Sequence, residues 1–358
     1  MKNWLYAIFC CLVACTSKSI DDVSPAICVD DMELCNDFNS LFSENACYDV
    51  IPLKVDSCCI PYVGMKLQIE NENFLLGDLQ FSNIVYRYGF NGEFINTIGC
   101  RGNGANEYPV LKDFTVLNDT INIVSLGSPG DCIFNYNIKG EFIGKVEIPN
   151  KIVSLVRNSA GEYIVNSGRN VYNSSWQITH YSSDWKVLGE YFELDPDENN
   201  VPIIESNFSV NEEFVFYHES FNNQLYVLKD TIKPTYRILF DGADDMRDIH
   251  KGSFVKAVEG LYKKGFYLVN SYVETDNLLC LILSYLKDTK TQKQVWIIFD
   301  KQRGMGHSLE ILEEELFVGD LCVKENSLYC MVTENFVRKY IKGELLSETD
   351  IYMLKIKL

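Results

Sequence analysis

The segments Tyr88-Gly-Phe-Asn-Gly-Glu-Phe94 and Tyr136-Asn-Ile-Lys-Gly-Glu-Phe142 share one pattern: an aromatic strand end, a polar turn containing Gly, and an aromatic residue that begins the next strand. Similar strand–turn segments recur at residues 181–185, 228–232, 299–304 and 340–344. Most of the spacings are roughly 40 to 50 residues, with one longer gap, which is typical of four-stranded propeller blades. We therefore predict an all-β fold, a six-bladed β-propeller with four-stranded antiparallel blades.

Alternating apolar and polar residues, separated by short turns, place the strands of each blade. We expect blade one at 65–98 and blade two at 112–148. The remaining blades are expected at 152–194, 207–240, 266–312 and 317–357.

Residues 241–262 interrupt this rhythm. Phe254, Val258 and Leu261 recur there at helical spacing, which predicts one short inserted helix between blades four and five. A ring of sheets must also be closed. We expect residues 48–55 to supply an outer strand to the last blade, because Pro52 is tolerated on an edge strand.

The N-terminus predicts export. Lys2 precedes an apolar run over residues 4–13, which is shorter than the roughly 20 residues of a membrane span and is typical of a signal peptide. The sequence Leu12-Val13-Ala14-Cys15 resembles a bacterial lipoprotein box, which implies a signal peptide at 1–14 and lipidation of Cys15. The alternative is an ordinary signal peptide with a chance cysteine. An acidic tether is expected at 15–46 and the propeller at 47–358.

Composition limits the function classes. At 47% hydrophobic and 13% aromatic residues, the chain can form a large core, so one closed propeller of 358 residues is favoured. A formal net charge of −18 opposes phosphate backbones and anionic lipid surfaces. We therefore expect no nucleic-acid partner, and membrane contact only through the N-terminal lipid.

The cysteines leave several readings open. Five of them crowd into the segment 28–59, where an oxidising compartment would permit disulfides. A zinc site is a weaker alternative, because no Cys-x-x-Cys pair is present. Cys322 and Cys330 flank a turn and are a further candidate pair, although cysteine in strands usually acts as a small apolar residue.

A family resemblance rests on the loop Ile98-Gly-Cys-Arg-Gly-Asn-Gly-Ala-Asn-Glu-Tyr108. It resembles the Gly-x-Gly-Pro-Gly-Glu-Tyr loop of the six-bladed β-propeller lipoproteins of Bacteroidetes, relatives in fold of the NHL-repeat propellers, but departs from it at Ala105 and Asn106. Further matches are Ile51-Pro-Leu53, Phe74-Leu-Leu-Gly-Asp78 and Tyr236-Arg-Ile-Leu-Phe-Asp-Gly242. The resemblance implies a propeller anchored to the outer membrane. Ser19-Ile-Asp-Asp22 weakly resembles a surface-export signal, so the periplasmic and surface-exposed faces both stay open.

Candidate site residues lie where ligands usually meet a propeller, on the face formed by the loops that join blades and the loops between second and third strands. The candidate ligand-binding residues are Asp78, Arg101, Glu107, Tyr108, Arg169 and His218. Gly102 and Gly104 could hold an anion through backbone amides, with Arg101 adding charge. The alternative is that these glycines only permit a tight turn, which Glu107 and Tyr108 then pin in place. No catalytic residue, metal site or cofactor is predicted.

These features favour a monomeric binding or scaffold module for a glycan, peptide or envelope protein. The alternative is a propeller lyase or lactonase with its site in the axial funnel, because fold does not decide function. A metal-dependent lactonase should aim several carboxylate, Asn or His side chains at the axis, and only Asp78 and His218 fit. A purely structural subunit of a larger complex is a third reading.

Overall fold

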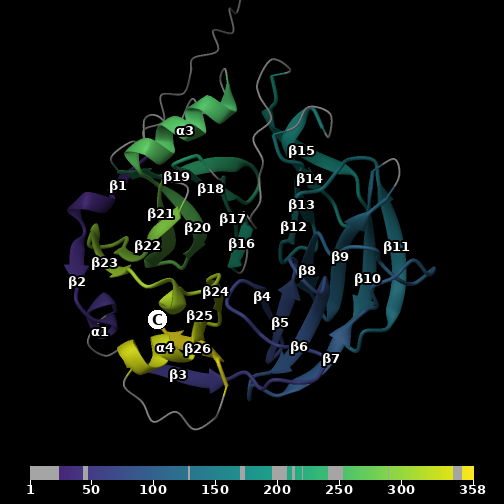
Figure 1. Cartoon of the computed structure of the whole chain (residues 1–358). Helices are drawn as coiled ribbons and strands as arrows, with labels where there is room; N and C mark the ends of the chain where they lie inside the picture. The colour runs from purple at the N-terminus through teal and green to yellow at the C-terminus, as the bar shows by residue number, and fades with distance from the viewer. Residues whose placement is uncertain are drawn as a thin grey trace, which may run out of the picture.

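The computed structural model describes residues 24–42, 47–127, 130–169, 174–195, 208–211, 214–219, 221–240, 253–288, 290–341 and 349–358. The expected signal peptide, Cys15 and the segment 19–22 lie outside these residues. Six sheets surround a common centre (Figure 1). Within each sheet, every strand pairs antiparallel with its neighbour in sequence, apart from the contributions of the N-terminal segment. The predicted six-bladed β-propeller is confirmed.

Blades one to three each contain four consecutive strands, close to the positions predicted from the sequence. Blade one comprises β4 (Lys66–Glu70), β5 (Asn73–Asp78), β6 (Ile84–Gly89) and β7 (Phe94–Ile98). Blade two comprises β8 (Asp113–Leu117), β9 (Thr120–Leu126), β10 (Asp131–Asn137) and β11 (Phe142–Ile148). Blade three comprises β12 (Ser154–Arg157), β13 (Tyr163–Asn166), β14 (Trp176–Tyr181) and β15 (Val187–Glu193).

Blades four to six also take strands from the N-terminal segment. Blade four comprises β16 (Phe208–Asn211), β17 (Phe214–His218), β18 (Gln224–Leu228) and β19 (Ile232–Leu239). Blade five comprises β20 (Phe266–Glu274), β21 (Leu278–Lys287), β22 (Lys290–Asp300) and β23 (Met305–Ile311). Blade six comprises β24 (Cys322–Lys324), β25 (Ser327–Thr333), β26 (Ile351–Lys357) and β3 (Cys47–Pro52).

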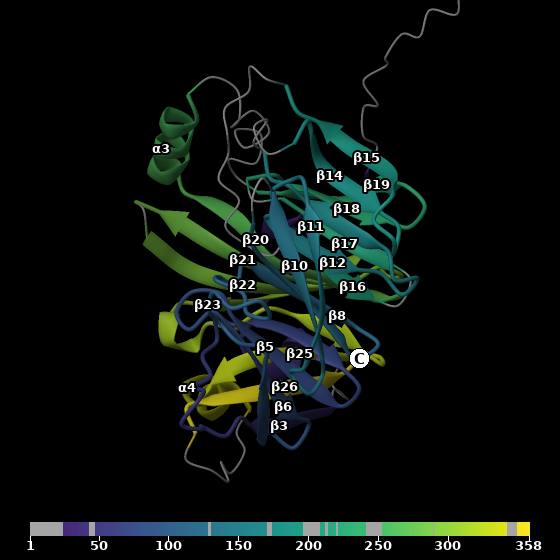
Figure 2. The same ribbon diagram turned by 90° about the vertical axis from the view of Figure 1, so that its right-hand side faces the viewer.

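The predicted inserted helix is present as α3 (Phe254–Lys264) in the connection from blade four to blade five. A shorter helix, α4 (Glu334–Phe336), follows β25. Both lie on one face of the ring, and the C-terminus lies on the opposite face (Figure 2). Because second strands such as β17 also end on the α3 face, this is the face on which the sequence places the candidate site.

The ring closes as predicted. β3 pairs antiparallel with β26, so an N-terminal strand completes the last blade. The adjoining turn of blade one fits tightly against this strand: the backbone N–H of Lys54 donates to the carbonyl of Gly92 at 2.9 Å. Gly92 has φ +78°, and a Cβ there would lie 1.9 Å from the carbonyl oxygen of Pro52. Only glycine fits at this contact.

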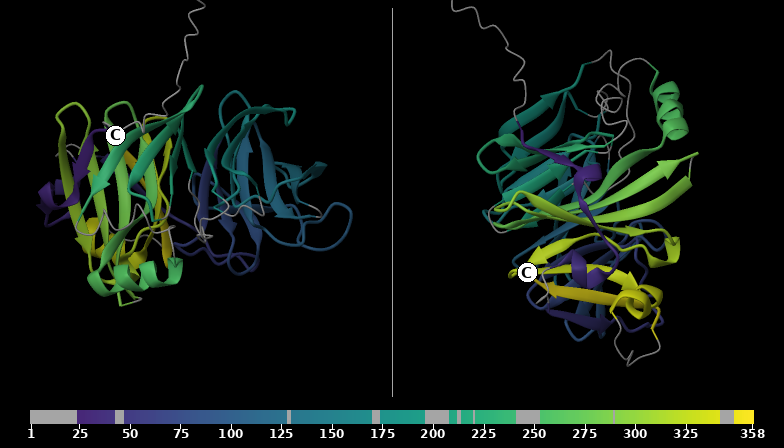
Figure 3. Two further views of the ribbon diagram at one scale, coloured as in Figure 1. Left: turned by 90° about the horizontal axis from the view of Figure 1, so that it is seen from above. Right: turned by 90° about the vertical axis from the view of Figure 1, so that its left-hand side faces the viewer.

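The N-terminal segment corrects one expectation. The sequence predicts a tether over 15–46, but part of it packs on the propeller. β1 (Ala26–Cys28) pairs parallel with β19, and β2 (Glu33–Cys35) pairs parallel with β23. The segment runs along the outer edges of blades four and five (Figure 3, right). The short helix α1 (Phe38–Leu41) buries Phe38 completely. The segment combines several acidic residues with few apolar ones, so its sequence resembles that of a solvated tether.

The core lies between adjacent blades, where side chains of neighbouring sheets interdigitate. Trp296 of blade five is fully buried, with its ring 5.4 Å from that of Phe38. Cys322 and Cys330 are both free thiols and do not pair across their turn. In the crowded N-terminal set, Cys28, Cys35, Cys58 and Cys59 are also free thiols. Among the residues that the structure describes, no group of three or more His, Cys, Asp or Glu side chains is arranged to hold a metal ion.

Candidate functional site in the axial cavity

The first strands of the blades surround the axis, and each contacts its neighbours around the ring. They enclose a cavity of about 240 Å³. All six first strands contribute to its wall, for example through Lys66, Thr115, Val156, Ser209, Ser271 and Cys322. Ligand pockets are commonly apolar clefts with a few polar groups that fix orientation, and this wall has that mixed character.

His218 is the one predicted site residue that lines this cavity. It ends β17, and only 2% of its surface is exposed. Within the described part of the chain, its Nδ1 has no hydrogen-bond partner. Burial lowers the pKa of His218 to about 4, so the imidazole is neutral at physiological pH. A neutral imidazole offers one acceptor and one donor nitrogen.

Asp320 also lines the cavity, in the segment just before β24, and the sequence reasoning missed it. Burial raises the pKa of its carboxyl group to about 6, with Lys66 opposing this shift and Asp113 adding to it. Among the described residues, no hydrogen bond to this carboxylate is formed. It lies in the connection from blade five to blade six, where a lone Asp after Gly forms no recognisable motif. Only the folded ring brings it to the axis.

Lys66 and Asp113 form a buried ion pair between blades one and two. The Asp113 carboxylate also accepts the backbone N–H of Phe114 at 2.8 Å and that of Leu155 at 2.7 Å. The Lys66 ammonium donates a second bond, to the Phe114 carbonyl, at 3.0 Å. These contacts tie three blades together beside the axis and leave both charges compensated.

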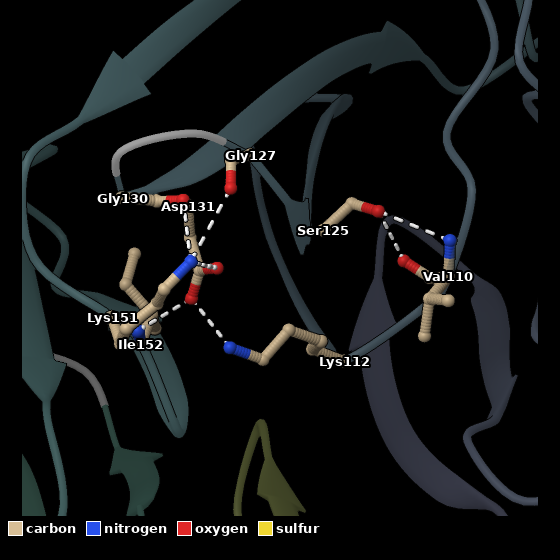
Figure 4. A network of polar contacts seen from close by, with 8 residues as sticks. All are labelled: Val110, Lys112, Ser125, Gly127, Gly130, Asp131, Lys151 and Ile152. Atoms are coloured by element: carbon tan, nitrogen blue, oxygen red, sulfur yellow. Dashed lines mark hydrogen bonds and ion pairs between the residues drawn. The ribbon is translucent and has the colours of Figure 1, made fainter. Parts of the chain in front are cut away.

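A second charged network joins the inter-blade connections around blade two (Figure 4). The fully buried carboxylate of Asp131 accepts Lys112 Nζ, and Lys151 Nζ lies 3.5 Å from it. It also accepts the backbone N–H of Ile152 at 2.7 Å. Lys151 donates further to the carbonyl of Gly130 at 2.8 Å. One carboxylate thus fixes the starts of two successive blades, which explains why it is buried with two cations.

Asp78, a predicted ligand contact, is occupied by the protein itself. Its carboxylate accepts Tyr62 Oη at 2.7 Å and the backbone N–H groups of Phe81 and Ser82 at 2.9 and 2.7 Å. Burial alone would raise the pKa of Asp78, but these hydrogen bonds hold it below the usual value. Asp78 therefore fixes the turn after β5.

The Gly-rich loop is likewise held by its own side chains. Glu107 Oε2 accepts the backbone N–H of Gly104 at 2.9 Å, so a carboxylate takes the amide that an anion would need. A Cβ at Gly102 would lie 2.0 Å from the same Glu107 oxygen. Tyr108 is completely buried, and Arg101 donates to the Ser82 carbonyl at 3.3 Å. The geometry supports the reading of a pinned turn over that of an anion cradle.

Arg169 joins blade three to blade four. Its guanidinium donates to both carboxylate oxygens of Glu219, at 3.2 and 3.3 Å, and to Gln177 Oε1 at 3.4 Å. Glu219 follows His218 directly in the sequence, so this ion pair anchors the end of β17. The structure thus separates the predicted residues: Asp78 and Arg101 meet at Ser82, Glu107 and Tyr108 hold their own loop, and Arg169 supports the strand end that carries His218.

Comparisons with known proteins agree with the fold. The family described as "Domain of unknown function (DUF4934)" matches residues 48–355. An exported protein of Bacteroides fragilis is similar in structure, with 16% identity, a TM-score of 0.70, and 91% of this chain and 98% of that chain covered. A DUF4221 family member from Bacteroides vulgatus has 11% identity, a TM-score of 0.54, and coverages of 87% and 96%. No curated protein sequence matches the chain. Among the described residues, no helix is both long and apolar enough to cross a membrane.

Proposed function

Since the chain belongs to the DUF4934 family and folds as a propeller similar to an exported protein, we propose that it is a lipid-anchored binding module of the cell envelope. Its ligand is a small polar molecule, a glycan or peptide fragment, held in the axial cavity. A cavity of about 240 Å³ is smaller than the roughly 300 to 1,000 Å³ of sites for drug-sized molecules, so the bound group is small.

The observation that carries this proposal is a pair of polar groups in the cavity wall that lack hydrogen-bond partners among the described residues: the Asp320 carboxylate and Nδ1 of His218. Burying a carboxylate such as Asp320 without donors costs stability, and so does burying an unpartnered imidazole nitrogen. A propeller axis that served packing alone would be more stable with apolar residues at these positions. Perturbed titratable groups in a cavity are typical of functional sites.

The proposed location rests on the N-terminal sequence. Lys2, the apolar run and Cys15 support export and lipid anchoring at the outer membrane. Replacing Cys15 with Ser should release the protein from the membrane fraction into the soluble fraction, as detected by fractionation and by loss of metabolic labelling with a fatty acid. Membrane retention of C15S without labelling of the wild type would contradict the anchor.

A second candidate function, a lyase or lactonase, is favoured by one observation. A carboxyl group with a pKa near 6 lines the same cavity as a neutral imidazole. A group that titrates close to neutral pH, as Asp320 does, can exchange a proton with a substrate. Turnover of a lactone or uronic-acid glycan that is lost in both Asp320→Asn and His218→Gln would establish this alternative.

A thermal-shift screen tests the binding proposal, because a ligand that binds only the folded state raises the melting temperature. The protein should begin at Thr16, since the packed segment 24–42 belongs to the fold. Saccharides, short peptides and peptidoglycan fragments are screened against the wild type and a Ser209→Phe variant, whose larger side chain should fill the cavity. A shift in the wild type that S209F abolishes supports the proposal. Equal shifts in both proteins, or none, contradict it.

A further inference from the structure

We propose that the turn after β5, together with Arg101, forms a second binding surface for a glycan that carries carboxylate groups, such as an oligomer of uronic acids. This rim surface consists of Tyr62, Phe81, Ser82 and Arg101 and lies on the face where the second strands end. The axial cavity is lined by other residues. The inference therefore goes beyond the proposed function and does not depend on it.

Phe81 is 72% exposed, although its backbone is firmly held. The Asp78 carboxylate that accepts the backbone N–H groups of Phe81 and Ser82 also accepts Ser82 Oγ at 2.7 Å. Tyr62 donates to the same carboxylate, and its ring centre lies 5.3 Å from that of Phe81, with the two rings tilted by 69°. A preorganised aromatic side chain loses little conformational entropy on binding. The ring is thus ready to contact a ligand.

Arg101 places a positive charge beside this turn. Its Nη1 donates to the carbonyl oxygen of Ser82, the residue that follows Phe81. The side chain is exposed, and among the described residues it forms no ion pair. Its other N–H groups can bind both oxygens of a carboxylate, the geometry that a guanidinium matches best. In a chain with a formal net charge of −18, this cation favours an anionic group here.

The small size of the rim surface favours a glycan over a protein. Apart from Phe81, the nearest exposed large apolar residue along the chain is Ile60, two positions before Tyr62. A stable protein interface buries roughly 800 Å² on each partner and draws on about 20 residues. A sugar ring can place its C–H face on one aromatic ring while a carboxylate reaches the adjacent guanidinium. A neutral sugar would leave Arg101 without a partner, so a uronic acid fits both groups.

Ligand-observed NMR titrations with a trisaccharide of galacturonic acid and with its full methyl ester test this inference, because esterification removes the charge and keeps the sugar rings. The wild type should bind the acid about fivefold more tightly than the ester, the upper range for an exposed ion pair. Arg101→Gln should remove this preference while keeping a donor for Ser82. Phe81→Ala should weaken the binding of both forms by about fivefold or more, because the ring contact is lost.

Two exposed positions elsewhere provide matched controls. Arg303→Gln removes a guanidinium whose side chain is 80% exposed, and Leu312→Ala truncates an apolar residue that is 67% exposed. Both variants should bind the trisaccharide as the wild type does. Because Phe81 and Arg101 are exposed, F81A and R101Q should also melt close to the wild type, which thermal melts check.

The outcomes separate the rim surface from the axial cavity. Acid binding that persists in S209F and falls in both F81A and R101Q supports the rim surface. Binding that S209F abolishes but F81A retains places the sugar in the axial cavity, which overturns this inference and supports the proposed function. Equal binding of acid and ester, or acid binding unchanged in R101Q, overturns the carboxylate assignment. No binding of either form, or Arg101-dependent binding of a glutamate-rich peptide in its place, overturns the glycan assignment.

Discussion

Replacing Asp320 with Asn should stabilise the protein, more at neutral than at acidic pH. Asn has nearly the same shape but cannot ionise, so it removes the cost of a buried charge. The folded-state pKa of Asp320 is raised from 3.8 to about 6, which means that the folded protein favours the protonated form. Stability from this group is fully present below pH 3.8 and is lost as the pH rises to about 6.

The size of the effect follows from the shift. A rise of roughly two pKa units corresponds to a cost of about 3 kcal/mol at pH 7.5 and about 1 kcal/mol at pH 4.5. Water in the cavity reduces both values. D320N should therefore gain about 1 to 2 kcal/mol more at pH 7.5 than at pH 4.5. For a domain of this size, that difference equals a shift in melting temperature of about 1 to 3 °C.

Differential scanning calorimetry of D320N and wild type at the two pH values measures this difference. Comparing the two proteins at each pH cancels the titration of His218 and of the other groups they share. Asp184→Asn, in an exposed turn, should show no such pH-dependent gain. A D320N protein that is less stable than wild type at pH 7.5 would mean that the carboxylate has stabilising partners, and it would refute the reasoning that Asp320 is buried at a cost.

Three further predictions concern other parts of the fold. His218→Gln should make the protein less sensitive to acid. The folded-state pKa of His218 is lowered to about 4, so the stability that the neutral imidazole contributes is present above pH 6.5 and is lost as the pH falls towards 4. Thermal melts of both proteins should show that the wild type loses at most about 3 kcal/mol more than H218Q between pH 7.5 and 4.5. Phe38→Ala should lower the free energy of unfolding by about 3 to 5 kcal/mol in denaturant titrations, because Phe38 is fully buried. Leu34→Ala, at a position that is 58% exposed, should leave it nearly unchanged. Equal effects of the two substitutions would mean that the N-terminal segment does not pack on the blades. Gly92→Ala should lower the melting temperature by several degrees because its Cβ would meet the closing strand, whereas Gly144→Ala meets nothing within 4 Å and should have little effect on it.

The sequence alone predicted the features that depend on local pattern. Alternating residues and turns such as 88–94 set the strands and blades, because side chains alternate between the two faces of a strand. The inserted helix was predictable from the spacing of Phe254, Val258 and Leu261, and β3 from its strand-like residues and the need to close the ring. The packed N-terminal segment was missed, because its apolar residues are few and their partners, such as Trp296, lie far along the chain.

The candidate site was decided by the tertiary structure. His218 was selected from its place at a strand end, but the same rule also selected Asp78, whose carboxylate proved to be occupied by donors from its own turn. Asp320 carries no local signal, because a lone Asp after Gly resembles any turn. Its raised pKa, its lack of donors and its place beside Lys66 arise only when six blades bring distant residues to one axis, since burial and charge pairing depend on the whole ring.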